Sequence, residues 1–329
     1  MKDKERIIDP DACVHCHLCR QHCLFLEKYK LDIGDKEKLE ELSYHCFLCG
    51  KCSEVCPKGI DGREIILNMR KEQVKRNDGQ LREKGYGLLV REKQNYLFQN
   101  YRNGTKKSVL FPGCNFPAFY PETTGYLMEL FRDKAGAGTV FDCCGKPIAE
   151  LGMEKKEEMI LEQLERKLEE HGVEEVITLC PNCYSYLKPR LKGKVVGIYE
   201  KLRDLGIGRA IEKKITIFPP CPDRENKELL GTIQVFLKEE PDIISHVQCC
   251  GLGGCAGSKE KDLAKQMIRR IGPEKGETVY TYCASCSGNF VRKGYGDTKH
   301  ILLELLERNE EPDTGGSMVN RIKLKYRRE

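Results

Sequence analysis

The sequence has no tryptophan, and no apolar segment approaches the roughly 18 residues that a membrane-spanning helix needs. Its N-terminal segment, MKDKERIIDPDACVHC, contains neither the apolar core of a signal peptide nor a twin-arginine pair. Charge of one sign is also scarce, since 56 basic and 51 acidic residues leave a net charge of +5 and no basic stripe carries interleaved aromatic residues. We therefore expect a cytoplasmic protein that does not bind nucleic acid.

Cysteine, by contrast, is abundant, with 19 in 329 residues. Thiols stay reduced in the cytosol, so this many cysteines more often bind metal or carry out redox chemistry than form disulfides. With 40% hydrophobic residues the chain can bury a sizeable core. At about 150 residues per domain, its length predicts two or three domains.

The first eight cysteines form two runs of the pattern C-x2-C-x2-C-x3-C within residues 1–78. In two-cluster ferredoxins the fourth cysteine of each run binds the cluster held by the other run. The spacing therefore predicts two [4Fe-4S] cubane clusters in an α-helical ferredoxin domain. The predicted ligand sets are Cys13, Cys16, Cys19 with Cys56, and Cys46, Cys49, Cys52 with Cys23.

A pair of zinc sites is the alternative interpretation of these runs, because C-x2-C pairs also suit tetrahedral zinc. Zinc motifs rarely add a third cysteine two residues on and a fourth three residues beyond, and here both additions occur twice. A complete set of thiolates favours solvent-facing or partner-facing roles for His15 and His17. Leu24 follows the last cysteine of the first run, where proline often stands, whereas Pro57 occupies that place in the second.

Helical patterns separate and follow the two runs. Residues 35–42 are charged and suit a short helix, and residues 60–76 place Ile65 and Ile66 on one face of an amphipathic helix. Residues 79–107 show no sustained period. We interpret them as a partly helical connector that contains a domain boundary.

The remainder of the chain repeats itself, which indicates a duplication. VLFPGC recurs as TIFPPC, TVFDCCG as SHVQCCG, and VITLCPNC as VYTYCASC, in the same order. We place the two copies at residues 108–210 and 211–309. Strand-like runs alternate in them with helical segments at 121–134, 153–171 and 258–271, which favours Rossmann-like α/β modules with parallel sheets.

Each copy carries five cysteines. Adjacent cysteines on a strand point to opposite faces, so both members of a Cys-Cys pair can bind one site only if the backbone turns. Gly145 and Gly251 follow the two pairs and give that freedom. Five thiolates exceed the four of an ordinary cubane, which indicates a larger cluster. The two sets are Cys114, Cys143, Cys144, Cys180, Cys183 and Cys221, Cys249, Cys250, Cys283, Cys286.

A lone cysteine, a Cys-Cys-Gly and a C-x2-C, duplicated behind a two-cluster ferredoxin domain, resemble the CCG-domain family. The arrangement is similar to the D-type heterodisulfide reductase subunits, which fuse the C-type and B-type subunits, and to the iron–sulfur subunits of glycerol-3-phosphate, glycolate and lactate oxidases. The resemblance implies an α+β multidomain protein with two noncubane [4Fe-4S] clusters, one per module, facing each other across a pseudo-twofold interface. It implies that the two sets of five cysteines hold these clusters and that a disulfide between them is cleaved in two one-electron steps.

The chain also departs from the family pattern. Pro222 and Asp223 follow Cys221, where a histidine is common. Some relatives hold zinc in place of a cluster in one module, and that alternative stays open for either half. A thioredoxin-like role for CPNC and CASC would leave the upstream Cys-Cys pairs unexplained.

Several residues near the motifs have no assigned role. Cys255 lies in the glycine-rich GLGGCAGS, where it serves as a substrate-exchanging thiol, a spare ligand or, as single cysteines more often do, a small buried hydrophobic residue. Lys146, Tyr184, His246 and Asn289 are unranked candidates for hydrogen-bond or proton donors.

The C-terminal residues 310–329 have the composition of a spacer followed by a basic tail. The plain interpretation is a solvated tail. The alternative is docking to an acidic partner, or peripheral contact with the cytoplasmic face of a membrane. The tail's basic residues are Arg321, Lys323, Lys325, Arg327 and Arg328.

We therefore predict a heterodisulfide reductase-like oxidoreductase subunit, whose catalytic residues beyond the cluster sites are unknown. It takes electrons from a flavoprotein or ferredoxin, relays them through the cubanes to the CCG clusters and reduces a disulfide, together with other subunits of a redox complex. The alternative is an electron-transfer subunit that links a flavin dehydrogenase of the 2-hydroxy acid or glycerol-3-phosphate type, or an electron-transfer flavoprotein, to quinone. A third interpretation is a zinc-stabilised scaffold without redox work.

Overall fold

The computed structural model describes residues 6–272 and 277–327, which divide into two compact units. Each unit combines segments that are far apart in the sequence. The first unit comprises residues 6–90, Pro147–Glu157 and Ser245–Arg270. The second unit comprises Arg91–Lys146, Glu158–Ile244 and residues 271–327.

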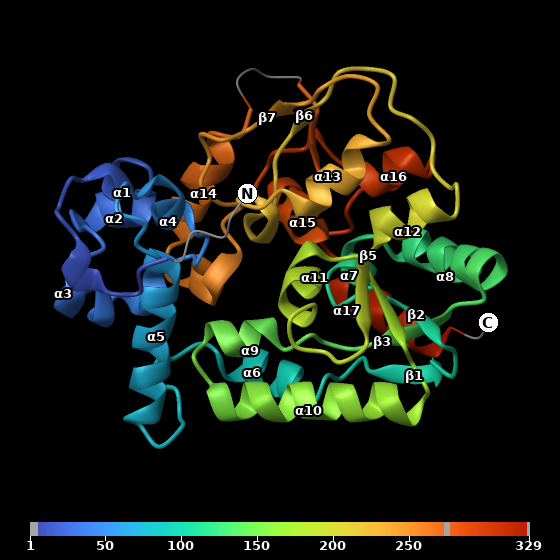
Figure 1. Ribbon diagram of the computed structural model, residues 1–329, viewed down its shortest axis with the longest axis horizontal. Helices are drawn as coiled ribbons and strands as arrows, with labels where there is room; N and C mark the ends of the chain where they lie inside the picture. Colours follow the sequence, from blue (N-terminus) through green and yellow to red (C-terminus); the bar gives the residue numbers. More distant parts are fainter. Residues whose placement is uncertain (1–5, 273–276, 328–329) are drawn as a thin grey trace. The chain divides into compact units, whose positions relative to one another are not determined.

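The N-terminal part of the first unit consists of short helices and loops (Figure 1). Its longest helix, α5, is capped by Asp61, whose carboxylate accepts the N–H groups of Arg63 and Glu64, both at 3.1 Å. Ile65 and Ile66 are buried, so the amphipathic helix predicted at residues 60–76 is confirmed. The elements are η1 (Pro10–Ala12), α1 (Leu18–Gln21), α2 (Leu24–Tyr29), α3 (Lys36–Glu41), η2 (Ser43–His45), α4 (Lys51–Val55) and α5 (Gly62–Lys75).

Two later segments complete the first unit. Residues 147–157 include most of α9 (Lys146–Glu150), and residues 245–270 include η4 (Gly253–Ser258) and α14 (Lys261–Arg269). Helix α14 confirms the helix predicted at residues 258–271. The second Cys-Cys-Gly sequence thus belongs to the same compact unit as the N-terminal cysteine runs.

The first sheet lies in the second unit and has the order β1-β3-β2-β4-β5. All of its pairings are parallel except that of β1 with β3, which is antiparallel. Its strands are β1 (Asn100–Asn103), β2 (Ser108–Phe111), β3 (Gly138–Phe141), β4 (Glu175–Thr178) and β5 (Lys194–Gly197). The helices in this region are α6 (Gly87–Gln94), α7 (Phe116–Phe119), α8 (Pro121–Ala135), α10 (Glu154–Glu170), α11 (Pro181–Leu187) and α12 (Ile198–Asp204).

The second sheet, also in the second unit, is entirely parallel and has the order β7-β6-β8-β9. This order matches β3-β2-β4-β5 strand for strand, as the internal repeat predicts (Figure 1). Its strands are β6 (Thr216–Ile217), β7 (Asp242–Ile243), β8 (Val279–Thr281) and β9 (Thr298–His300). The accompanying helices are η3 (Cys221–Asp223), α13 (Glu228–Gln234), α15 (Ala284–Arg292) and α16 (Ile301–Leu305).

The predicted connector at residues 79–107 contains more structure than its sequence indicates. It holds helix α6 and also strand β1, which forms the antiparallel edge of the first sheet. Tyr101 in β1 donates a hydrogen bond of 2.7 Å to the buried Asp142. The strand was missed because NYRN has no alternation of apolar and polar residues, and its place is set by tertiary contacts.

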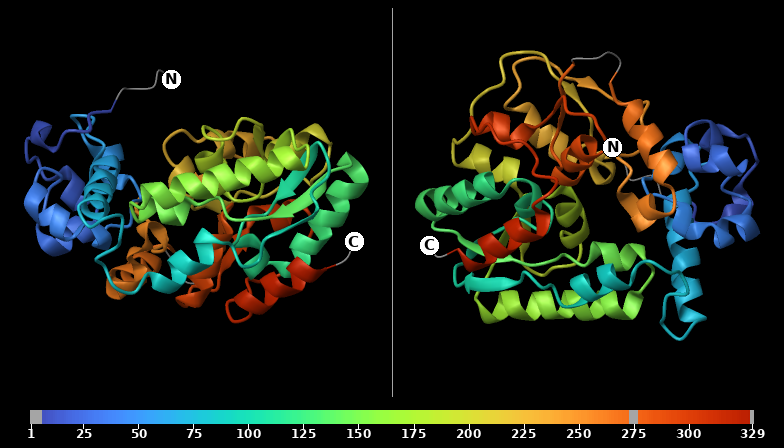
Figure 2. Two further views of the ribbon diagram at one scale, coloured as in Figure 1. Left: turned by 90° about the horizontal axis from the view of Figure 1, so that it is seen from below. Right: turned by 180° about the vertical axis from the view of Figure 1, so that it is seen from behind.

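The prediction of a flexible spacer and a free basic tail is wrong. Residues Ser317–Tyr326 form helix α17, which packs against α7 and α8 (Figure 2). Asn320 is buried and donates to the Ala118 carbonyl at 3.0 Å, and Arg321 contacts Glu92 at 2.6 Å. Arg327 forms an ion pair with Glu129, while Arg328 lies outside the described residues. The basic side chains therefore serve contacts within the second unit.

In residues 6–272 and 277–327, no helix combines the length and the apolar character needed to cross a membrane.

Candidate functional site

The two N-terminal cysteine runs fold into matching loops in the first unit. In each loop, the residue two positions after the first cysteine and the residue four positions after it have positive φ: His15 (49°) and His17 (63°) in one, Leu48 (48°) and Gly50 (76°) in the other. L-residues rarely adopt this conformation, and such strained backbone clusters at binding sites. It turns amide groups toward sulfur, because the N–H groups of His15 and Leu48 donate to the first thiol of their own loops at 3.4 and 3.3 Å.

The thiols of these loops form two groups. One cavity is lined by Cys13, Cys16, Cys19 and Cys56, together with Cys52. The charge of Cys23, in turn, interacts with Cys49 and Cys46. The ligand sets themselves stay a prediction, but the structure brings each proposed fourth cysteine to the opposite run.

The two histidines of the first loop share one buried partner. His17 Nδ1 lies 2.6 Å and His15 Nδ1 3.4 Å from Asp32 Oδ2, and both imidazoles are about half exposed (48% and 51%). Asp32 is buried and also accepts from the Cys19 thiol at 3.7 Å. The histidines face solvent as predicted, and Asp32 is the partner that the sequence did not reveal.

The environment of these thiols favours a bound cation. Burial raises the pKa of Cys19 and of Cys46 to about 11, and it also raises the pKa of Cys23 and Cys52. A buried thiolate needs a compensating positive charge. Iron supplies that charge, so the donor set fits iron–sulfur clusters.

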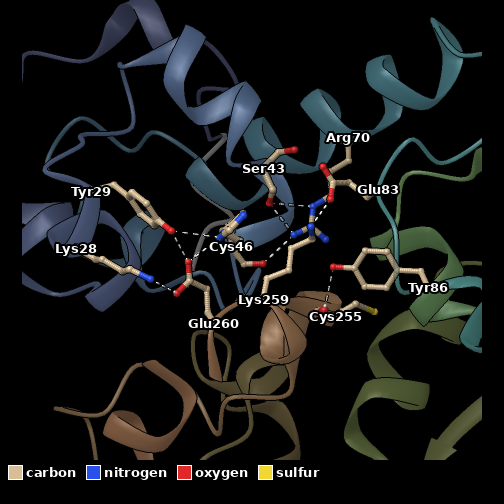
Figure 3. A network of polar contacts seen from close by, with 11 residues as sticks. Lys28, Tyr29, Ser43, Cys46, Arg70, Glu83, Tyr86, Cys255, Lys259 and Glu260 are labelled. Carbon is tan, nitrogen blue, oxygen red and sulfur yellow. Dashed lines mark hydrogen bonds and ion pairs between the residues drawn. The ribbon is translucent and has the colours of Figure 1, made fainter. Parts of the chain in front are cut away.

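Arg70 on α5 provides a fixed positive charge beside the second loop (Figure 3). Its side chain is fully buried and lies 4.8 Å from the Tyr44 ring centroid. The guanidinium donates to the backbone carbonyls of Ser43 (2.7 Å), Cys46 (2.8 Å), Glu150 (2.6 Å) and Gly254 (2.8 Å). The sequence carried one signal for it, since an arginine stands on the apolar stripe of α5, four residues after Ile66.

Glu260 is a second buried charge that holds the later segments to the N-terminal helices (Figure 3). Its carboxylate accepts from Lys28 (2.6 Å), Tyr29 (2.7 Å) and His45 (2.7 Å). Burial alone would raise the pKa of Glu260, but these hydrogen bonds outweigh it and hold the pKa below its usual value. The residue also precedes the first turn of α14.

The glycine-rich segment of the first unit packs against the second cysteine loop. A Cβ atom at Gly253 would lie 2.3 Å from the Phe47 carbonyl oxygen, and one at Gly254 would lie 2.5 Å from that of Cys46. Close backbone approach thus explains these glycines. Cys255, which has a φ of 57°, is half-buried, with its Sγ 4.0 Å from the Pro147 carbonyl oxygen.

The cysteines of the first module gather in the second unit, at the ends of three strands. Cys114 follows β2, Cys143 and Cys144 follow β3, and Cys180 begins α11 after β4. Gly145 has a φ of 84°, and Gly251 in the first unit has 82°, so the predicted turns after both Cys-Cys pairs are confirmed.

An unbroken line of thiol contacts joins the two modules within the second unit. Hydrogen bonds from Cys143 and Cys183 lower the pKa of Cys144 to about 5, which favours its thiolate as a metal ligand. Cys180 contacts Cys283, which begins α15 in the second module. In order, the line runs through Cys114, Cys143, Cys144, Cys183, Cys180, Cys283 and Cys286.

Each module also packs part of its first cysteine loop on the other module's C-x2-C helix. Helix α7 packs on α15, where Asn115 donates to Ser285 at 2.6 Å and Tyr120 to Ser287 at 2.8 Å. Reciprocally, η3, which starts at Cys221, packs on α11. The exchange has the character of a twofold arrangement. Cys249 and Cys250 belong to the first unit, so the five-thiol set of the second module stays a prediction.

Lys93 and His300 are polar groups near these thiols that the sequence did not single out. Lys93 is buried, and although burial lowers its pKa, the Cys114 and Cys143 thiolates and Glu92 raise it further, so the ammonium stays charged. Burial lowers the pKa of His300 to about 3, so its imidazole is neutral. Lys93 stands in a polar segment without periodicity, where no pattern marks it. The unranked Tyr184 donates to Glu228 at 2.6 Å, and His246 contacts the Arg270 carbonyl at 2.8 Å.

Comparison with known proteins agrees with this arrangement. The cysteine-rich domain CCG matches residues 108–188 and 215–291. The B-type subunit of the CoM/CoB fumarate reductase of Methanothermobacter marburgensis is 24% identical over 90% of this chain and 71% of its own length. The D-type subunit of the dihydromethanophenazine:CoB–CoM heterodisulfide reductase of Methanosarcina barkeri is 24% identical over 78% of this chain and 74% of its own.

A third relative, an uncharacterized iron–sulfur protein of Methanococcus maripaludis, is 27% identical over 80% of this chain, which spans 58% of that protein's length. Among solved structures, a glutamate racemase of Bacillus anthracis covers 61% of this chain with 14% identity and a TM-score of 0.33, and the match covers 78% of the racemase, which is too weak a likeness to support an argument. The CCG domains and the iron–sulfur relatives support iron–sulfur clusters as cofactors. The chain belongs to the CCG-domain family of iron–sulfur proteins, with one cysteine-rich domain at residues 108–188 and a second at 215–291.

Proposed function

We propose that the chain is the disulfide-reducing subunit of a heterodisulfide reductase-like complex. The line of thiols that crosses from the first module to the second at Cys180 and Cys283 carries this proposal. Clusters bound by these thiolates would supply one-electron chemistry, and two electrons with two protons convert one disulfide into two thiols.

The chain's own residues fit this role. The eight N-terminal cysteines would hold two cubane clusters, and the two sets of five would hold two noncubane clusters. Arg70 and Lys93 place buried positive charge beside anionic ligands, which lowers the cost of burying thiolates. The buried Cys143, Cys144, Cys183, Cys283 and Cys286 keep bulk water away from the sulfur atoms.

The names of two relatives bear on the substrate. One is a CoB–CoM heterodisulfide reductase subunit and the other a CoM/CoB fumarate reductase subunit. We propose a disulfide of two small thiols as the substrate class of this chain. Both relatives are named as subunits, so we also propose that this chain works with other subunits and with a flavoprotein or ferredoxin as electron donor.

The quinone-linked alternative has lost its anchor. It required the basic C-terminal residues to be available to a membrane, but Arg321 and Arg327 pair with Glu92 and Glu129 in the second unit. The disulfide proposal does not depend on these residues.

An activity assay separates the two functions. Protein purified without oxygen is mixed with reduced methyl viologen and either a panel of thiol disulfides or a soluble quinone analogue. We expect oxidation of the dye with a disulfide and release of two thiols per disulfide. Rapid reduction of the quinone with no disulfide reduced would favour the electron-transfer alternative.

Metal analysis tests the cofactors without substrate. We expect iron and acid-labile sulfide in near-equal amounts, together with signals from reduced clusters in low-temperature electron paramagnetic resonance. Zinc in place of part of the iron would assign a zinc site to one module. Zinc without any sulfide would contradict the redox proposal altogether.

A further inference from the structure

Gln248 joins the two cysteine-rich sequences of the first unit. It is buried, with 5% of its surface exposed, and it immediately precedes Cys249 of the second Cys-Cys pair. Its Nε2 group donates to the Cys23 sulfur at 3.3 Å, and its Oε1 atom accepts the Leu24 N–H at 2.5 Å. A single amide thus contacts the last cysteine of the first run and the residue after it.

The backbone fixes the orientation of this amide. The Leu24 N–H can only donate, so the oxygen of Gln248 must face it and the NH₂ group must face Cys23. Leu24 stands where proline often follows the fourth cysteine, and proline has no N–H to give. Pro57 occupies the equivalent place after Cys56, so this pairing cannot form there.

We propose that Gln248 is a positioning residue that raises the reduction potential of the cubane bound through Cys23. The proposal rests on the iron–sulfur function argued above. A reduced cluster carries more negative charge on its thiolates than an oxidised one, so an N–H donor to sulfur stabilises the reduced form more. In a buried site this preference is strong, because little water is present to screen it.

The surroundings of the contact act in the same direction. It lies on a cavity of about 140 Å³ that is also lined by Arg20 and Arg270. The structure also links the contact to the second module, since the Gly251 N–H donates to the Cys249 sulfur at 3.2 Å, one residue beyond Gln248. A residue of the second CCG sequence therefore sets the potential of an N-terminal cluster.

The substitution Gln248→Leu tests the proposal, because it keeps a similar volume and removes both hydrogen bonds. We expect one cubane to become harder to reduce, with about a tenfold lower ratio of reduced to oxidised cluster at a fixed potential, which is about 59 mV for a one-electron couple. The measurement is a redox titration followed by electron paramagnetic resonance. The matched control is Gln266→Leu, an exposed glutamine on α14 in the same unit, which should leave both potentials unchanged.

A second variant, Leu24→Pro, leaves Gln248 in place and removes only the N–H that orients it. Leu24 is the first residue of α2, where proline is tolerated, and Cys23 before it is extended. We expect a smaller shift of the same cubane in the same direction. Unchanged potentials in Leu24→Pro and in an iron-replete Gln248→Leu would overturn the proposal, and if Gln248→Leu does not retain its iron, Leu24→Pro alone decides.

The titration uses no substrate, so it separates this inference from the proposed function. A shifted potential in a protein that reduces no disulfide would leave the role of Gln248 intact and sink the function. Disulfide reduction with unshifted potentials would do the reverse.

Discussion

The two CCG modules share one framework and differ in the residue that precedes the Cys-Cys pair. In the first module this residue is Asp142, which accepts from Tyr101 (2.7 Å), Gln99 (2.5 Å) and its neighbour's N–H (2.7 Å), all in the second unit. In the second module it is Gln248, which contacts Cys23 and Leu24 in the first unit. A duplicated motif has thus acquired two different partners.

The difference teaches that strand order and cysteine spacing do not decide where a motif is fastened. Both copies have the same sheet order. Yet the first Cys-Cys pair stays with its own sheet, whereas the second joins the N-terminal cysteine runs in another compact unit. One side chain per copy, a carboxylate in one and an amide in the other, accompanies this choice.

The largest effects should come from the cysteines that the two modules share. We expect Cys144→Ser and Cys250→Ser each to abolish disulfide reduction and to remove about four iron atoms per chain, as measured by iron and sulfide analysis. Cys255→Ser is the control and should retain the full iron content. Loss of zinc instead of iron in one variant would break the equivalence of the modules.

Removing the buried guanidinium of Arg70 should destabilise the first unit. Arg70→Met leaves the carbonyls of Ser43, Cys46, Glu150 and Gly254 without their donor, so we expect a loss of about 3 kcal/mol in the free energy of unfolding. Denaturant titration followed by circular dichroism measures it. The exposed Arg76→Met on the same helix should change stability by less than about 0.5 kcal/mol.

Asp142→Leu should have the effect opposite to that of the Gln248 variants. Tyr101 loses the acceptor of its buried hydroxyl, so we expect the unfolding free energy to fall by about 1–3 kcal/mol while both cubane potentials stay constant. Denaturant titration and the redox titration described for Gln248 give the two readouts. A shifted cubane potential in Asp142→Leu would remove the contrast between the modules.

The smallest effect concerns pH and His300. Its pKa is about 3 in the folded protein against an ordinary 6.5, because burial disfavours the charged ring. Stability from this group is complete above pH 6.5 and falls as the pH drops toward 3. At pH 6 we expect a loss of about 0.8 kcal/mol relative to pH 8.

Melting temperatures at pH 8 and pH 6 test this, with His300→Phe as the variant. It should show less of the drop between the two pH values than the parent protein. The exposed His246→Gln serves as the control and should keep the parent's drop. Equal drops in all three proteins would contradict the assignment.

Much of the fold followed from the sequence, because periodic patterns report local structure directly. The strands that end at Cys114 and Cys180 and helices such as α5 and α10 lie close to where the patterns place them. The turns after the Cys-Cys pairs followed from the steric freedom of glycine. The basic tail misled because lysine and arginine favour solvent on average, whereas here their partners are supplied by segments 192 or more residues away.

The candidate sites were predictable as far as their cysteines and no further. Spacing marks a thiol ligand, but nothing local marks the groups that surround it. Gln248 and Cys23 are separated by 225 positions, and Lys93 comes from a segment without any period. Only Arg70 left a trace, as a charge on an apolar stripe, and Leu24 left one as a missing proline.

Helix α17 has a consequence for how the protein is made. The first module begins near residue 100, yet its α7 and α8 are covered by the last helix of the chain, through Asn320 and the Arg321–Glu92 contact. During synthesis the N-terminal parts of a chain leave the ribosome first and usually fold first. Here the earlier module must wait for the final turn of the polypeptide to emerge, so we expect its iron to be inserted only after the chain has been released.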